Sequence, residues 1–188
     1  ATKTPVIMAL ILMGMIPSMF LMSNINGLMP VFASEILRNP DKGLGYLLSA
    51  YGVGALIGTL SLASLGNVKR KGVMLLIAAM GSAIFMILFS FTSSMWPSML
   101  ALVGIGSTQM FYMATNNTLI QTIVPDTLRG RVLSLFMLDF ALVSVGAITA
   151  GAIAKSFGIS EAFIFGGTVA LSLFIIVAFV FKQLRGEY

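Results

Sequence analysis

One stretch decides how the chain is organised: Thr108 to Phe140, which reads TQMFYMATNNTLIQTIVPDTLRGRVLSLFMLDF. Its first part is long enough to cross a membrane but carries many polar side chains. The stretch then breaks at Pro125, passes through a short basic loop, and enters an apolar run that holds one carboxylate, Asp139. Polar groups are costly in a bilayer unless they face protein or water. We therefore expect the polar half to line a cavity or an interface inside a helical bundle.

The composition is that of a membrane protein. The 188 residues are 58% hydrophobic and only 9% charged, with a mean hydropathy of +1.02, whereas soluble domains carry about 25% charged residues. Cys and His are absent, which excludes disulfide frameworks, thiol catalysis, imidazole acid–base chemistry and nearly all zinc or haem sites. We expect no enzymatic activity, no cofactor and no metal.

Six runs are long enough to span a bilayer, which needs about 20 apolar residues. The prediction is an all-α membrane protein with six transmembrane helices, forming one domain over residues 1–188, with the first helix interrupted at Pro17. The predicted spans are Thr4–Val31, Leu44–Leu65, Gly72–Phe91, Met95–Val124, Val132–Phe157 and Glu161–Phe181.

The six spans differ in a regular way. The third and sixth are apolar all round, which predicts lipid-facing helices on the outside of the bundle. The other four carry the polar residues and small-residue ridges. An apolar helix at every third position divides the chain into two three-helix repeats, residues 5–93 and 95–182. Because each repeat has an odd number of spans, the second would be inverted in the membrane relative to the first. Inverted repeats are typical of secondary transporters.

Basic residues gather on one predicted side of the membrane. Eight lie near the termini or in the loops at 66–71 and 125–131, against three on the other side. The positive-inside rule then predicts that both termini and these two loops are cytoplasmic. We read the net charge of +5 as this topology signal and expect no nucleic-acid partner. The eight are Lys3, Lys69, Arg70, Lys71, Arg129, Arg131, Lys182 and Arg185, and the three are Arg38, Lys42 and Lys155.

Two spans supply the candidate residues for a substrate cavity. Successive residues of a helix are rotated by about 100°, which places five polar side chains of the fourth span on one face about 140° wide. Two asparagines near the outer end of the first span are expected to face the same cavity. Five polar side chains on one face favour a solute pathway over simple hydrogen bonding between helices. The candidates are Asn24, Asn26, Thr108, Gln109, Tyr112, Thr115 and Asn116, with Asn117 and Gln121 assigned to the opposite side.

Two further patterns have both a structural and a functional interpretation. Small-residue ridges, at Gly54 and Gly58 in the second span and at Gly146 and Gly151 in the fifth, predict close helix packing and would also let helices slide. A row of methionines in the first span suits ordinary packing, and equally a surface for varied apolar ligands. The row is Met8, Met15, Met19, Met22 and Met29.

Asp139 is the acidic residue placed well inside a predicted span. It lies eight residues beyond Arg131, about 12 Å along a helix. A carboxylate at this depth should be paired, protonated or wetted by a cavity. Three interpretations stay open: a structural pair, proton coupling during transport, and snorkelling to the cytoplasmic surface.

Four segments carry a likeness to a known family: QTIVPDTLRGRVLS at Gln121–Ser134, GLGYLLSAYGVGALIGTL at Gly43–Leu60, GNVKRKG at Gly66–Gly72, and GAITAGAIAKSFGI at Gly146–Ile159. With them the chain resembles the C-terminal six-helix half of a major facilitator superfamily transporter. It is most similar to the bacterial exporter branch that includes the enterobactin exporter and multidrug efflux proteins. The likeness covers essentially the whole chain.

The resemblance implies an ion-gradient-driven efflux of a small amphipathic or hydrophobic solute by alternating access, in the bacterial inner membrane. Such transporters have twelve helices, so it also implies an N-terminal six-helix half as a partner. Two cytoplasmic loops are then candidates for gating, or for plain positive-inside anchoring. Their residues are Lys69, Arg70, Lys71, Asp126, Arg129, Gly130 and Arg131.

Two other classes compete with a transporter. A small six-helix channel would need a ring of charges or a carbonyl-lined filter, and no such segment stands out. A non-transporting assembly subunit would need only the small-residue ridges. A membrane enzyme is disfavoured because Asp139 has no His, Cys or metal set beside it.

Overall fold

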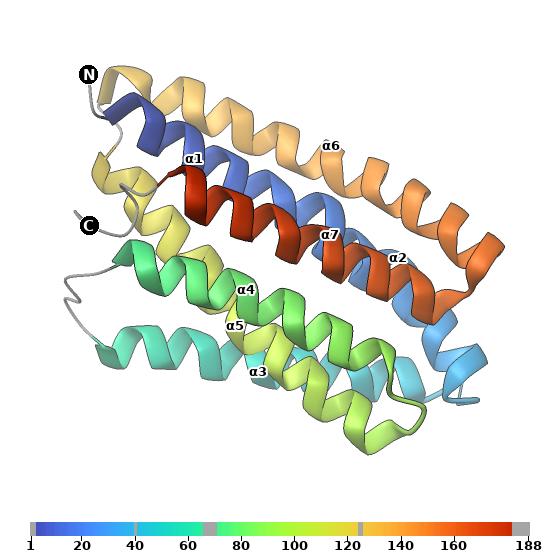
Figure 1. The fold of residues 1–188 in the computed structure, drawn as a ribbon. Helices are drawn as coiled ribbons and strands as arrows, with labels where there is room; N and C mark the ends of the chain where they lie inside the picture. The colour runs from blue at the N-terminus through green and yellow to red at the C-terminus, as the bar shows by residue number, and fades with distance from the viewer. Residues whose placement is uncertain (1–2, 40, 66–70, 124–125, 182–188) are drawn as a thin grey trace.

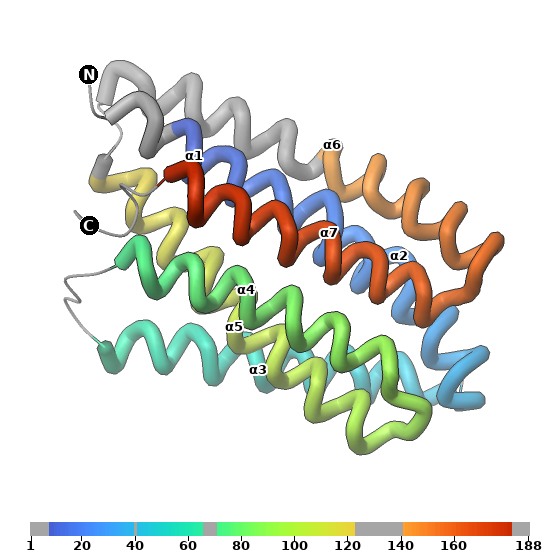
Figure 2. Tube along the Cα trace, in the orientation of Figure 1, coloured from blue at the N-terminus to red at the C-terminus, as the bar shows by residue number. Residues whose placement is uncertain are grey.

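A computed structural model of the chain describes residues 3–39, 41–65, 71–123 and 126–181 (Figure 1). The side chains of residues 3–7, 123 and 126–140 lie outside the described set, in segments that are grey in Figure 2. Everything below concerns the described part.

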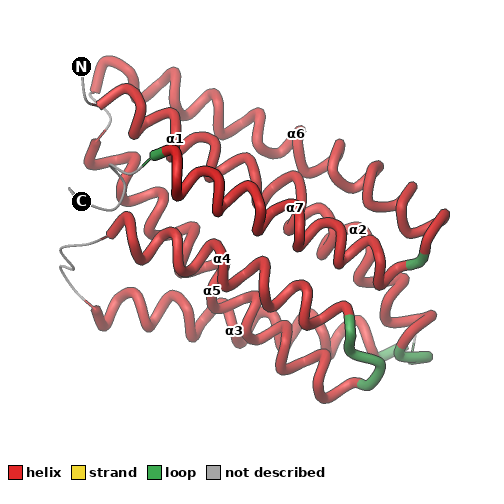
Figure 3. Tube along the Cα trace, in the orientation of Figure 1, coloured by secondary structure: helices red, strands yellow, loops and turns green. Residues whose placement is uncertain are grey.

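Six helical rods and their short connections make up this part of the chain, which holds no strand (Figure 3). The first rod is composite, because α-helical and π-helical segments follow one another without a gap from Lys3 to Ile36. Its segments are α1 (Lys3–Pro17), η1 (Ser18–Met22), α2 (Ser23–Val31) and η2 (Phe32–Ile36). The other rods are α3 (Gly43–Leu65), α4 (Lys71–Ser90), α5 (Met95–Ile123), α6 (Asp126–Phe157) and α7 (Ile159–Val180).

Four of these helices are long and apolar enough to cross a membrane: Met8–Ile36, Gly43–Leu65, Lys71–Ser90 and Ile159–Val180. The described apolar part of α6, Ala141–Phe157, is shorter. The 29-residue helix α5 is not among the four, because its polar residues lower its hydropathy. Length and composition thus identify an all-helical membrane protein.

Two predicted boundaries were wrong. The first rod does not end at Val31 but continues to Ile36, because a π-helical segment follows Pro30. The fifth span begins at Asp126 rather than Val132, so the predicted loop at 126–131 is helical. A proline disfavours helix for the residue before it but is tolerated at the start of a helix, and nothing in the residues after Pro125 opposes one.

The bundle is built by pairing helices from the two halves of the chain. α3 packs on α5, α6 packs on η1 and α2, and α4 packs on both α5 and α7. The beginning of α1 and the end of α7 lie at the same end of the bundle (Figure 1).

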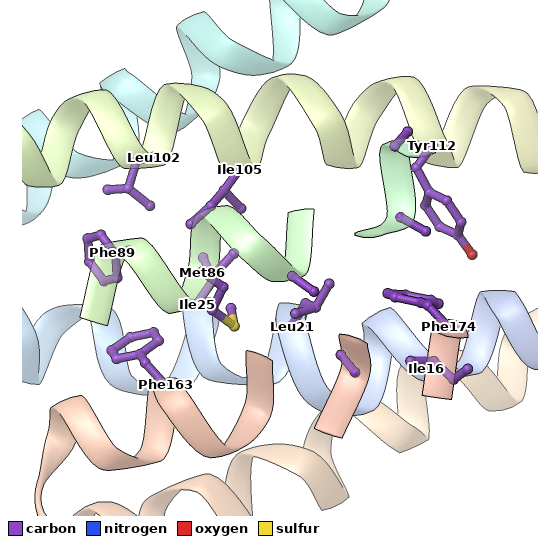
Figure 4. Close-up of a cluster of buried hydrophobic side chains, with 14 of the residues drawn as sticks. Ile16, Leu21, Ile25, Met86, Phe89, Leu102, Ile105, Tyr112, Phe163 and Phe174 are labelled. Carbon is purple, nitrogen blue, oxygen red and sulfur yellow. The ribbon is translucent and has the colours of Figure 1, made fainter. Parts of the chain in front are cut away.

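An apolar core fills the space between the first rod, α4, α5 and α7 (Figure 4). Its centre is an aromatic cluster in which Phe32, Phe89 and Phe163 meet. The Phe32 and Phe89 ring centroids are 4.4 Å apart, and Phe163 packs edge-on against both at 5.8 and 5.1 Å. Such arrangements add to the free energy gained by burial.

The expectation that the third and sixth helices are the outer ones needs correction. α4 is half buried, as much as the first rod, whereas α3 is the least buried of the four apolar spans, at 22%. α4 exposes Ile77 and Leu88 on one side only and buries residues such as Leu75 and Met86 on the other. A helix that is apolar all round is equally suited to lipid and to a protein core.

The first small-residue ridge packs as predicted. A Cβ added at Gly54 would collide with the Val103 carbonyl of α5, and one added at Gly58 with the Ser107 carbonyl. In α6, Gly146 lies just as close to the Met19 carbonyl, but Gly151 has open space around it. The second ridge is therefore confirmed at Gly146 and wrong at Gly151.

Candidate functional site

A cavity of about 220 Å³ lies between the first rod, α5 and α6. The first rod contributes the segment around its π-helical turn, α5 contributes a face that is more than two turns long, and α6 contributes one valine. Four of the eleven lining residues have amide side chains and two are methionines. The lining residues are Gly14, Pro17, Ser18, Met22, Asn26, Gln109, Tyr112, Met113, Asn116, Asn117 and Val143.

The cavity sits where Pro17 disturbs the helical hydrogen bonds. In an α-helix the Met13 carbonyl would accept from the N–H of residue 17, but proline has none. The Tyr112 hydroxyl of α5 donates to this carbonyl. A buried carbonyl in a membrane protein must find such a partner, so Tyr112 links α5 to the first rod. The π-helical segment η1 follows immediately, at Ser18.

Gln109 is held between two other helices. The Tyr51 hydroxyl of α3 donates to Gln109 Oε1 at 3.2 Å, and Gln109 Nε2 donates to the Met22 sulfur of η1 at 3.5 Å. The side chain is only 5% exposed. These contacts orient its amide at the edge of the cavity, where the second Nε2 hydrogen is left to donate.

Asn116 lies one turn beyond Tyr112 on α5 and is 3% exposed. Its Oδ1 atom has no hydrogen-bond partner among the described residues. Its Nδ2 faces the first rod at Gly14, where an added Cβ would be 3.7 Å away. A buried polar atom without a partner costs free energy, and such atoms in native proteins call for a functional or solvent partner.

The structure brings together four of the seven predicted cavity residues, Asn26, Gln109, Tyr112 and Asn116. The other three lie elsewhere. Thr108 lies against Gly81 of α4, in a separate apolar groove of about 550 Å³ between α3, α4 and α5. Thr115 is buried and donates to the Phe111 carbonyl of its own helix.

Asn24 is the third residue outside the cavity. It is buried, its Nδ2 donates to the Phe20 carbonyl, and it lies against Gly166 of α7. Its Oδ1 also lacks a partner among the described residues. Asn24 therefore belongs to the interface between the first rod and α7.

Sequence reasoning missed Asn117, Met113 and Ser18 as lining residues. Asn117 was assigned to the opposite side of the fourth span, because the polar face was centred too near Thr108. Centring it on Gln109, Met113 and Asn116 includes Asn117 within about 140°. The available signal was Asn117 itself, a second carboxamide next to Asn116.

Most of the predicted gating and coupling residues lie outside the described set. Lys69 and Arg70 lie outside it entirely, and for Asp126, Arg129, Gly130, Arg131 and Asp139 only the backbone is described. Lys71 is the first residue of α4 and is partly exposed.

None of the described charged side chains lines the cavity, because all of them lie at or near helix ends. Among the described residues no group of His, Cys, Asp and Glu is arranged to hold a metal. The charged residues are Glu35, Arg38, Asp41, Lys42, Lys71, Lys155 and Glu161.

A bundle of apolar helices long enough to cross a membrane, around a cavity that no charged side chain of the described residues lines, defines an integral membrane protein. The chain belongs to the transmembrane secretion effector family of the major facilitator superfamily, whose family model matches residues 3–187. This is a family of membrane transporters.

One curated relative is the multidrug efflux pump Tap of Mycolicibacterium fortuitum, 27% identical over 183 residues. The match covers 94% of this chain and 43% of the relative, so the chain spans less than half the length of that protein. No solved structure matches the chain significantly.

Proposed function

We propose that the chain is one half of a secondary transporter that exports a small amphipathic or hydrophobic solute by alternating access, driven by an ion gradient. The observation that carries this proposal is the cavity at Pro17, which lies between helices of both halves of the chain and is lined by no charged side chain of the described residues. Substrate sites of secondary transporters lie near the middle of the membrane, at interrupted helices. The relative's printed name, a multidrug efflux pump, supports the direction of transport.

The pairing of helices supports two inverted repeats, residues 5–93 and 95–182. The second rod of each repeat packs on the first rod of the other: α3 on α5, and α6 on η1 and α2. The third rods, α4 and α7, pack on each other. Exchanging the two repeats leaves this set of pairs unchanged, as expected for units related by a two-fold axis in the membrane plane.

A second six-helix half would complete the cavity. The outward face of α3 exposes large apolar side chains, such as Leu56 at 65% and Leu60 at 67%. The chain corresponds to 43% of its relative's length. We propose that an N-terminal half covers the substrate cavity, in the bacterial inner membrane with both termini of this chain cytoplasmic.

The cytoplasmic segments would serve as gates. Lys69, Arg70 and Lys71 precede or begin α4, and the residues from Asp126 to Arg131 form the first turns of α6. Arginines there are suited to pairing with carboxylates or with lipid phosphates of the inner leaflet.

Transport by the complete transporter in inside-out vesicles tests the proposal. We expect amphipathic solutes to accumulate when an ion gradient is imposed and to leak out when an uncoupler collapses it. Gln109→Ala should reduce accumulation at limiting solute concentration, whereas Thr115→Val, a buried position outside the cavity, should not. A solute-dependent ion current that needs no gradient-driven cycle would identify a channel, and no accumulation of any solute would rule out the transporter.

Asp139→Asn tests proton coupling in the same vesicles. Asparagine keeps the size of the side chain but cannot bind and release a proton. We expect proton-driven accumulation to fall by more than about tenfold, while exchange of solute without a gradient continues, because exchange needs no net proton movement. Unchanged proton-driven accumulation with unchanged pH dependence would leave Asp139 a structural partner.

A further inference from the structure

The cavity is unusual in the chemistry of its lining. Four carboxamides, from Asn26, Gln109, Asn116 and Asn117, meet in about 220 Å³, and no charged side chain of the described residues lines it. A carboxamide both donates and accepts hydrogen bonds. The described part of the lining therefore offers both a donor and an acceptor without an electrical charge.

Two of these amides keep hydrogen-bonding capacity for a ligand. Gln109 is oriented by Tyr51 and Met22 and has one Nε2 hydrogen to spare. Asn116 is 3% exposed, and its Oδ1 has no partner among the described residues. The thioethers of Met22 and Met113 supply a polarisable apolar surface beside them, suited to an aromatic or aliphatic group.

We propose that this cavity selects uncharged solutes that carry amide or hydroxyl groups on an apolar body, in preference to organic cations. The proposal rests on the transport function above and specifies its substrate class. A cation in this place would lose its water and gain no counterion from the described lining, which is a large penalty in a membrane interior. A neutral amide loses less and regains its hydrogen bonds from Gln109 and Asn116.

The size of the cavity fits the same class. It is smaller than the roughly 300–1,000 Å³ of sites for drug-sized ligands. The part of the cavity that this chain supplies therefore accepts a small solute, or the polar end of a larger one that extends toward the second half.

A matched pair of probes tests the proposal: N-acetyltryptophanamide, which is neutral, and tryptophanamide, which has the same indole and primary amide but a free amine. At about pH 6 the amine is protonated. Binding to the purified complete transporter in lipid nanodiscs is measured by equilibrium dialysis with radiolabelled probes. We expect the neutral probe to bind at least about tenfold more tightly. Equal affinity, tighter binding of the cation, or no binding of the neutral probe would each overturn the proposal.

Three variants locate the selectivity. Asn116→Leu keeps the side-chain size and should weaken binding of the neutral probe by up to about tenfold, the effect of losing a neutral hydrogen bond. Gln109→Glu places a carboxylate beside Tyr51 and should shift the preference toward the cation. Thr115→Val, buried on the same helix outside the cavity, should bind as the unmodified chain does. Circular dichroism and gel filtration identify any variant that fails to fold.

If Asn116→Leu and Gln109→Glu fold but leave the probe preference unchanged, the cavity does not set selectivity and the proposal fails. This binding result is independent of whether the transport experiment supports the proposed function. Selective binding without gradient-driven accumulation would contradict transport alone, and gradient-driven accumulation of cations in preference to neutral solutes would contradict the substrate class alone.

Discussion

At the scale of single residues, Tyr112 joins three parts of the structure: its ring, its hydroxyl and its place in the cavity each make a different contact. Its ring packs near Phe174 of α7, with centroids 6.3 Å apart, while its hydroxyl donates to the Met13 carbonyl. It also lines the cavity. Because Pro17 has no N–H, the Met13 carbonyl accepts its hydrogen bond from Tyr112 of α5 instead. This hydrogen bond holds one side of the candidate cavity in place.

Tyr112→Phe should destabilise the chain by about 1–3 kcal/mol, because a buried carbonyl is left without its donor. The measurement is reversible thermal or denaturant unfolding in mild detergent, with Tyr46→Phe, an exposed tyrosine on α3, as the control. In a Pro17→Ala background residue 17 again has an N–H for Met13, so the penalty for losing the hydroxyl should shrink. An equal penalty in both backgrounds would contradict this explanation.

At the scale of helices, periodicity and composition predicted most of the fold. The predicted ends of the second, third and fourth spans agree with α3, α4 and α5 to within about one residue, because apolar runs and loops alternate clearly there. The first rod was harder to predict. Prolines usually end helices, whereas π-helical segments at Ser18–Met22 and Phe32–Ile36 let this rod continue past Pro17 and Pro30.

The same limits applied to the candidate site. The polar face of the fourth span was visible in the sequence, but its rotation toward a neighbour depends on packing that no single helix contains. Thr108 contacts α4 because Gly81 leaves room for it, and this moves the cavity face toward Asn117. The link between Tyr51 and Gln109 joins residues 58 positions apart, and no local pattern indicates such a pair.

Two glycines on α3 provide a matched test of close helix packing. Gly58→Ala should destabilise the bundle by about 1–3 kcal/mol, because the new methyl group would meet the Ser107 carbonyl of α5 and push the helices apart. Gly52→Ala, where nothing lies within 4 Å, should be neutral or stabilising by up to about 1 kcal/mol, since alanine favours helix. Unfolding of both variants is compared with the unmodified chain. Equal effects would show that the α3–α5 contact is looser than described.

At the scale of the whole molecule, the apolar surface is distributed unevenly. Of the four helices identified as membrane spans, α3 is the least buried, at 22%, whereas the first rod and α4 are half buried. The helices therefore differ in how far they are covered: the first rod and α4 enclose the aromatic core, and α3 leaves large apolar side chains exposed. Under the proposed transporter, solute would pass through the cavity between the first rod, α5 and α6, and the second half would cover it.

The orientation of the chain is open to a clean test because it contains no cysteine, so each introduced cysteine is the only thiol. Lys71 begins α4, and Lys155 lies in the last turn of α6, at the opposite end of the bundle under the proposed topology. If the excess of basic residues sets the orientation, a membrane-impermeant maleimide added to intact cells should label Lys155→Cys and not Lys71→Cys. Inside-out vesicles should give the reverse pattern, and permeabilised cells should label both variants. Labelling of Lys71→Cys in intact cells would invert the topology and place the two proposed gates on the outer side.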